Sequence, residues 1–210
     1  MTADEQSEQE NNPVCARFIN TVDWRNSPAQ RHETLNTYAD LVKWAREAGI
    51  LSDVAAHKLV KHASRNRQAA EAALHDALLL RESLYAIFSA TSSGREPPKA
   101  DLNRLNAAIQ ESGKHVSLVQ SNAGGFRWEW QGKEDYFDRM LWPIVRSAAE
   151  LLTSDNLERL RECEAEGCGW IFLDTTRNRS RRWCSMESCG NRAKAQRFYQ
   201  RHKADSTLAR

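Results

Sequence analysis

The sequence lacks any apolar run long enough to cross a membrane. Its first twelve residues, MTADEQSEQENN, are acidic and polar, and so lack the basic start and the apolar stretch of a signal peptide. No repeat or low-complexity tract appears beyond two polar tails, which we expect to be disordered, at residues 1–12 and 204–210. With 40% hydrophobic residues the chain can build a core. The sequence therefore predicts a soluble, globular, cytoplasmic protein that does not contact a membrane.

Cysteine is scarce, with five residues in 210. In a chain without a secretion signal, so few cysteines argue against a disulfide framework. Four of them lie within 27 consecutive residues, from Cys163 to Cys189. Cys15 stands apart, and we expect it to be a small buried apolar residue.

Familiar catalytic motifs are also missing. The sequence contains no nucleophile elbow, no phosphate loop and no His-Glu metal motif, and its six histidines are scattered without ligand spacing. An enzyme acting on a small molecule is one hypothesis for the N-terminal part, but it has little support. We expect no enzymatic activity.

Hydrophobic periodicity predicts a mainly helical domain over residues 13–154. Its clearest signals are a capping-box-like Thr37-x-x-Asp40 before a helix that stops at Gly49, and a long core helix from Gln68 to Ala90. Shorter helices are predicted at Asp101–Ile109 and Tyr136–Thr153. The apolar segment Val14–Trp24 fits a helix or a strand equally well, and both alternatives stay open.

Between these helices the period changes to two. His115–Val119 and Phe126–Trp130 alternate polar and apolar residues across a turn that contains Gly124 and Gly125. This pattern predicts a β-hairpin near residues 115–130, with Trp128 and Trp130 on one face. The predicted fold class is therefore mainly α with a small β-hairpin.

Several polar side chains lie within apolar segments of this domain and are candidates for a ligand pocket. They are Asn20, Thr21, Trp24, Arg25 and Arg81. Each could equally be a cap, a turn residue or a satisfied polar group of the core. Arg81 interrupts the stripe of the long helix, and a snorkelling or surface arginine is the favoured interpretation over a buried anion clamp. The domain is expected to sense a small-molecule effector or to form a homodimer.

The strongest pattern is Cys163-x4-Cys168-x15-Cys184-x4-Cys189. Two close pairs separated by a foldable linker suit Zn²⁺, which takes four thiolates at about 2.3 Å in a tetrahedron. Because the protein would fill all four positions, one structural zinc ion is predicted. The alternative is a set of buried or redox cysteines.

The surroundings of these cysteines predict a treble-clef-like module over residues 155–203. Trp170–Leu173 suits a strand between the pairs, and Gly190–His202 suits a helix whose amino end points at Cys189. A knuckle, a short hairpin and a helix with the last ligand make up that outline.

The run Cys184–Lys194 (CSMESCGNRAK), preceded by Trp170-x-Phe172-x-Asp174, resembles the CGNR zinc finger. Upstream, Phe18–Arg25 and the stretch from Trp142-Pro143 to Leu152 are similar to the ABATE domain that normally precedes this finger. Together the resemblances span nearly the whole chain. Proteins of this build are described as stress-induced transcription regulators of bacteria, so the resemblance implies DNA binding.

Residues 174–203 hold nine Lys or Arg against two acidic residues, a net +7, whereas the rest of the chain carries −5. This asymmetry indicates an anionic partner for the C-terminal part. The candidate DNA contacts are Arg177, Arg179, Arg181, Arg182, Arg192, Lys194, Arg197, Arg201 and Lys203. Lys194, Arg197 and Arg201 share a helix face. Arg192 lies so near Cys189 that it could brace the zinc site instead. The alternative function is a protein-binding adaptor that does not contact DNA.

Overall fold

A computed structural model describes residues 12–121, 124–131 and 136–208, and its side chains as far as Gln200. It confirms the predicted class, a mainly helical domain with small antiparallel hairpins followed by a cluster of four cysteines. The tail expected at residues 1–12 lies, except for Asn12, outside the described residues. None of the helices in the described ranges is long and apolar enough to span a membrane.

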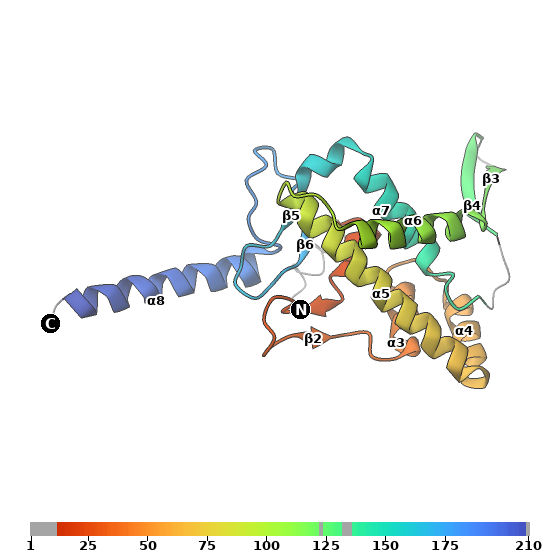
Figure 1. Ribbon diagram of the computed structural model, residues 1–210, viewed down its shortest axis with the longest axis horizontal. Helices are drawn as coiled ribbons and strands as arrows, with labels where there is room; N and C mark the ends of the chain where they lie inside the picture. Colours follow the sequence, from red (N-terminus) through yellow and green to blue (C-terminus); the bar gives the residue numbers. More distant parts are fainter. Residues whose placement is uncertain (1–11, 122–123, 132–135, 209–210) are drawn as a thin grey trace.

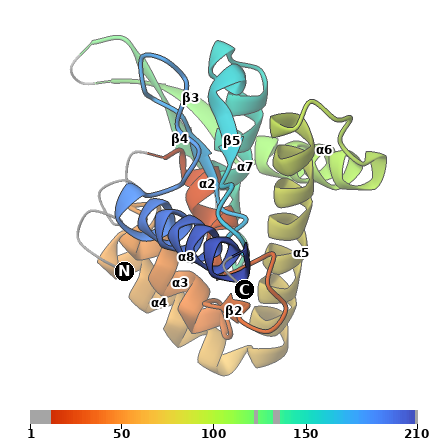
Figure 2. The same cartoon turned by 90° about the vertical axis from the view of Figure 1, so that its left-hand side faces the viewer.

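Helices α2 to α7 form the body of the molecule (Figure 1). Their bounds are Val14–Ile19 (α2), Tyr38–Glu47 (α3), Asp53–Arg65 (α4), Arg67–Ser92 (α5), Lys99–Gly113 (α6) and Leu141–Leu152 (α7). The long helix α5 is the predicted core helix, and it packs against α2, α3, α4 and α6. Figure 2 shows the other helices of the body arranged alongside it. One hydrophobic core therefore joins all these helices.

Local signals set the helix ends. Thr37 caps α3 with the predicted capping box, because its hydroxyl accepts from the Asp40 N–H at 3.2 Å and its own N–H donates to the Asp40 carboxylate at 2.8 Å. α7 begins at Leu141, five residues later than predicted. Pro143 lies in its first turn, where the missing N–H has no helical partner to lose.

The ambiguous segment 14–24 contains both alternatives. Helix α2 ends at Ile19, and β1 (Val22–Asp23) follows and pairs antiparallel with β2 (His32–Glu33). Cys15 is fully buried in this region, as expected, and burial raises the pKa of its thiol to about 11.

The predicted hairpin is present as β3 (Val116–Gln120) and β4 (Phe126–Trp130). Leu118 pairs with Trp128 in its register. Trp128 is 53% exposed, and the guanidinium carbon of Arg146 lies 4.7 Å from the centroid of its ring. Trp130 lies 6.1 Å from the ring of Trp142 on α7.

Arg81 is buried, with 2% exposure, so the interpretation as a surface or snorkelling residue is wrong. Its guanidinium binds the Glu33 carboxylate in a bidentate manner, at 2.7 and 2.5 Å, and also donates to the Thr21 hydroxyl at 2.9 Å. The anion that it clamps is thus a side chain of this protein. The ion pair and the hydrogen bonds offset the desolvation penalty of burying the guanidinium, whereas an unpaired guanidinium would have no such compensation.

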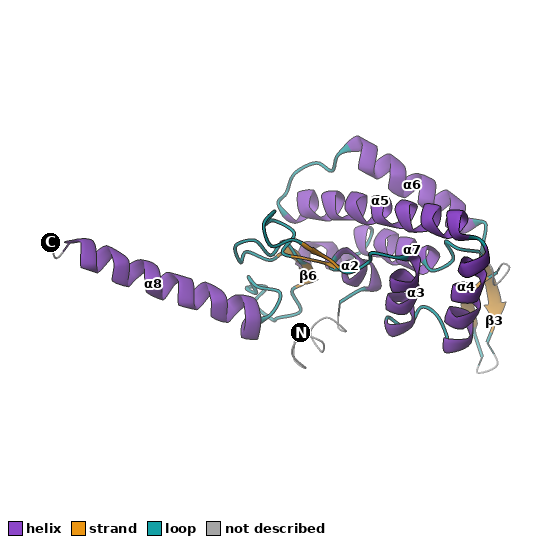
Figure 3. Cartoon of the chain, turned by 90° about the horizontal axis from the view of Figure 1, so that it is seen from below, coloured by secondary structure: helices purple, strands orange, loops and turns teal. Residues whose placement is uncertain are grey.

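The C-terminal elements are η1 (Asp155–Arg159), β5 (Leu160–Glu162), β6 (Ile171–Leu173), η2 (Met186–Gly190) and α8 (Asn191–Leu208). β5 and β6 form an antiparallel pair. Leu160 and Ile171 belong to the helical core, whereas Phe172 belongs to the cysteine cluster. α8 extends away from the body (Figures 1 and 3) and continues to Leu208, into the tail predicted from residue 204.

Candidate metal centre

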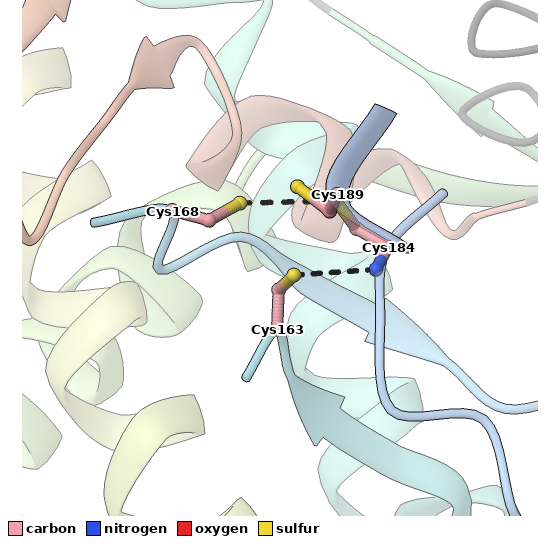
Figure 4. Close-up of side chains that lie close together, drawn as sticks. All are labelled: Cys163, Cys168, Cys184 and Cys189. Atoms are coloured by element: carbon pink, nitrogen blue, oxygen red, sulfur yellow. Dashed lines mark hydrogen bonds between the residues drawn. The ribbon is translucent and has the colours of Figure 1, made fainter. Parts of the chain in front are cut away.

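The four predicted zinc ligands meet at one point. Cys163 directly follows β5, Cys168 lies just before β6, Cys184 lies in the loop before η2, and Cys189 is inside η2. Their sulfur atoms all lie within 4.8 Å of one another, and all four side chains are buried. Figure 4 shows the four side chains pointing toward a common centre.

The sulfur geometry fits a zinc ion. Four sulfurs at about 2.3 Å from Zn²⁺ in a tetrahedron are about 3.8 Å apart. The Cys168 and Cys184 sulfurs are 3.7 Å apart, and those of Cys184 and Cys189 are 3.5 Å apart. Because four protein thiolates complete the tetrahedron, the centre holds one structural zinc and leaves no position for a reacting water.

The first pair sits on a tight turn between β5 and β6. The Cys168 N–H donates to the Ala165 carbonyl at 3.0 Å. Gly167 and Gly169 on either side of Cys168 both have positive φ, at +76° and +71°. These left-handed conformations favour glycine, and they fold the chain back so that Cys163 and Cys168 face the same point.

The second pair is set by the π-helical turn η2. The Ser185 hydroxyl accepts from the Ser188 N–H at 3.4 Å, and the Gly190 N–H donates to the Ser185 carbonyl at 2.9 Å. Asn191 then donates its side-chain amide to the Glu187 carbonyl at 2.9 Å. Asn191 therefore braces the turn that presents Cys189.

Charge and hydrogen bonding favour thiolate at Cys189. Hydrogen bonds from the thiols of Cys163, Cys168 and Cys184 lower its pKa below that of a free thiol, and the positive charge of Arg192 acts in the same direction. The Arg192 Nη2 donates to the Cys189 sulfur at 3.2 Å. Because zinc binds the thiolate, the guanidinium of Arg192 favours the form of Cys189 that the metal requires.

The loop between the two pairs is organised by Asp174, which is fully buried. Its carboxylate accepts from the Thr176 N–H at 2.9 Å, the Thr176 hydroxyl at 2.5 Å and the Arg181 N–H at 2.8 Å. Burial opposes ionisation, but these hydrogen bonds outweigh it and lower the pKa of Asp174. The aspartate thus links the two ends of loop 174–181 and sets the path of the chain that leads to Cys184.

The N-terminal domain packs directly against the zinc knuckle, the turn between β5 and β6 that carries Cys163 and Cys168. The N–H groups of Arg25 and Asn26 donate to the carbonyls of Cys168 and Gly167, at 3.0 and 3.1 Å. The Asn20 amide forms two hydrogen bonds with the backbone of Ile171, at 2.8 and 2.9 Å. The finger and the helical body are thus joined by paired backbone groups as well as by the shared core.

The residues expected to line a ligand pocket are mostly engaged within the protein. Asn20 holds Ile171, Thr21 donates to the Phe18 carbonyl, and Arg25 donates to Glu82 and to the Ile19 carbonyl. Arg81 holds Glu33. Trp24 differs, because it borders a cleft of about 660 Å³ between residues 24–30 and the first turns of α8.

The basic residues of the finger divide by environment. Arg181 donates to the carbonyls of Trp183 and Cys184 and covers the Phe172 ring, so it belongs to the scaffold. Arg192 belongs to the zinc centre. Arg179 and Arg182 form exposed ion pairs with Glu158 and Glu164. Such exposed pairs are worth little and can be exchanged for phosphate. Arg177, Lys194 and Arg197 are exposed.

Helix α8 has two opposite faces. At about 100° per residue, the face of Lys194 and Arg197 is roughly 180° from the face of Arg192 and Tyr199. The latter face borders the cleft toward the N-terminal domain. The basic face therefore points away from the body. Arg201 and Lys203 lie in α8, in the part whose side chains are outside the described residues.

Comparison with known families agrees with this two-part organisation. The model of the family ABATE, described as "putative stress-induced transcription regulator", matches residues 12–155. The model of the CGNR zinc finger matches residues 159–202, the segment with the four cysteines. Neither description names an enzyme. No curated protein matches the chain.

Proposed function

The chain belongs to the ABATE family and carries a CGNR zinc finger, and from this premise we propose that it is a transcription regulator that binds DNA through the basic face of α8. The observation that carries the proposal is the exposed pair Lys194 and Arg197 on one face of α8, a helix that projects from the body in Figures 1 and 3. Its 18 residues correspond to about 27 Å, enough to lie in a major groove. We further propose that the zinc module, whose last ligand lies just before this helix, is a treble clef.

Charge supports this assignment. Residues 174–203 carry a net +7, and four thiolates on Zn²⁺ leave the centre at a formal −2, so this segment and the metal centre together keep a basic excess of about +5. Arg181 and Arg192 are held inside the finger, so the contacts to phosphate come from the exposed set. Among the described side chains, that set is Arg177, Arg179, Arg182, Lys194 and Arg197. Arg201 and Lys203, whose side chains lie outside the described residues, stay predicted contacts.

Binding to a mixed-sequence DNA duplex should fall steeply with salt. Neutralising about five phosphates predicts a slope of log affinity against log salt concentration of roughly −4 to −5. Replacing Lys194 and Arg197 together by Ala should weaken binding to every sequence and reduce the slope by about two, because two counterion-releasing contacts are lost. Fluorescence anisotropy at several salt concentrations measures both.

The matched control removes two exposed charges, Lys61 and Arg65, from α4 in the helical body. We expect the slope of this variant to equal that of the unmodified protein. Equal losses in both variants, or an affinity that ignores salt, would contradict the proposal. Pull-down with nuclease treatment tests the adaptor alternative, since partners retained without nucleic acid would favour it. The effector and the homodimer expected for the N-terminal domain stay predictions, and sedimentation velocity tests the second.

A further inference from the structure

The segment from Trp24 to Asn26 reaches both halves of the zinc centre. The knuckle side is held by the two backbone hydrogen bonds to Gly167 and Cys168. On the helix side, the guanidinium carbon of Arg192 lies 4.1 Å from the centroid of the Trp24 ring. The segment therefore contacts the ligand residue Cys168 directly through the Arg25 N–H. It reaches Cys189 through Arg192, which donates to the Cys189 sulfur.

The position of this segment is set by the helical body. The Arg25 guanidinium donates to Glu82 on α5 at 2.5 Å and to the Ile19 carbonyl at 2.8 Å, and it lies over the Tyr85 ring at 4.2 Å. Trp24 itself has a φ of +51°, which is rare for a residue with a side chain. Such a conformation persists when its surroundings hold it.

The knuckle is shaped to fit this tryptophan. A side chain at Gly167 would begin 3.0 Å from Cε3 of Trp24 and 3.0 Å from Cβ of Ser27. One at Gly169 would begin 2.8 Å from Nδ2 of Asn26. The two glycines therefore permit a close approach between the finger and the 24–27 turn, besides supplying the positive φ of the knuckle.

The contact between Trp24 and Arg192 has a direct effect on the metal ligand. A guanidinium N–H donated to a thiolate stabilises its negative charge and restricts its orientation. The Arg192 side chain has many rotamers, and holding one of them costs conformational entropy. The face of an indole ring attracts a guanidinium, so Trp24 holds that rotamer in advance.

We propose that Trp24 is a positioning residue of the zinc centre: its ring holds Arg192 against Cys189, so the N-terminal domain sets the zinc affinity of the finger. A shift of the 24–26 turn then changes metal affinity without any change in the four ligands. The proposal needs only the zinc centre, and it stands whether or not α8 binds DNA.

The test is competition for zinc against a chromophoric chelator, using the full chain. Arg192→Met keeps much of the side-chain volume but removes the donor to Cys189, and it should lower zinc affinity by about 10- to 100-fold, as for other partners of metal ligands. Arg197→Met is the matched control, because Arg197 is on the same helix, over Trp183 at 5.6 Å, and makes no contact with sulfur among the described side chains. Its zinc affinity should change less than about threefold.

A double-variant cycle assigns the role of Trp24. Trp24→Ala should lower zinc affinity by about 3- to 30-fold in the unmodified chain and have almost no effect in the Arg192→Met background. Trp24→Phe keeps a ring face and should restore part of the loss. Hydrogen exchange of α5 checks that each variant keeps its fold, and the Phe variant carries the test should the Ala variant not fold. Arg192→Met within threefold of the unmodified affinity, or an equal effect of the Trp24 changes in both backgrounds, would overturn the proposal.

Discussion

Removing zinc with a chelator, or replacing Cys184 by Ser, should unfold the zinc module beyond β6 and leave the helical body folded. Apart from the four cysteines, the described core of this module contains Ala165 and Phe172, flanked by Trp170 and Trp183. So small a core cannot offset the entropy of ordering loop 174–190. Structural zinc contributes apparent binding energies of about 10–16 kcal/mol in zinc-finger peptides, which is the largest single contribution available here.

This unfolding should stop at β6, because residues of β5 and β6 are buried in the helical core. Leu160 and Ile171 are buried in the helical core, and Asn20 holds both backbone groups of Ile171. These contacts do not involve the metal. The hairpin should therefore stay folded after metal loss, whereas residues 176–200 should lose their protection.

Hydrogen exchange followed by mass spectrometry measures this outcome. Without zinc, protection should fall at residues 176–200 and persist in α5 and β6. Cys15→Ser is the matched control, because Cys15 belongs to the helical core and not to the cysteine cluster, so that variant should still bind one zinc ion in native mass spectrometry. Persistent protection of residues 176–200 in metal-free protein would contradict the expectation, as would unfolding of the whole chain with the metal.

Patterns of short range were predictable from the sequence. The 3.6-residue period over Gln68–Ala90 predicted helix α5, which runs from Arg67 to Ser92, and the α3 cap is complete within Thr37–Asp40. The zinc ligands were equally clear, since four thiolates at matched spacing are a local signature. The strand β5 was missed because three residues carry no readable alternation. Segment 14–24 was ambiguous because it changes from helix to strand within a few residues.

The sequence could not distinguish the roles of basic residues that lie close together in the finger. Arg192 and Arg197 are five residues apart, and the sequence predicts a DNA contact for both. The structure joins Arg192 to Trp24, 168 residues away in the chain, and leaves Arg197 on the exposed face. A distant partner of this kind has no local signal. Spacing alone showed that Arg192 lies near a zinc ligand, which made bracing an alternative from the beginning.

Arg81 shows the same limit for a buried charge. A charged residue in an apolar stripe is more often at the surface, and its partner Glu33 lies 48 residues away, in a two-residue strand that the sequence does not predict. Glu82 and Arg25 extend this ion pair into a network, because Glu82 contacts both Arg81 and Arg25. The network connects α5 to the segment that carries Trp24.

Replacing Arg81 by Met should lower the free energy of unfolding by about 2–4 kcal/mol at pH 7, because it leaves the Glu33 carboxylate without its bidentate partner. We expect less than a fully buried pair would lose, since the Glu33 side chain is 29% exposed. Arg67→Met is the matched control on the same helix. Its ion pair with Glu71 is exposed, so the change should stay within about 0.5 kcal/mol. Urea denaturation of the zinc-loaded proteins measures both, and equal losses would contradict the assignment.

The loss of stability caused by Arg81→Met should also depend on pH, in the direction set by the pKa of Glu33. Burial opposes its ionisation, but the hydrogen bonds from Arg81 and the Leu35 N–H outweigh burial and lower the pKa of Glu33 below its usual value. A carboxyl whose pKa is lower in the folded state stabilises the fold above its unfolded pKa of about 4.3 and loses that contribution as the pH falls through the folded pKa. The difference between the unmodified protein and Arg81→Met should therefore be full at pH 7 and shrink below about pH 4. The measurements are made with excess chelator at every pH, so that both proteins are free of zinc throughout. A difference in the free energy of unfolding that stays constant down to pH 3 would show that Arg81 acts through packing rather than through Glu33.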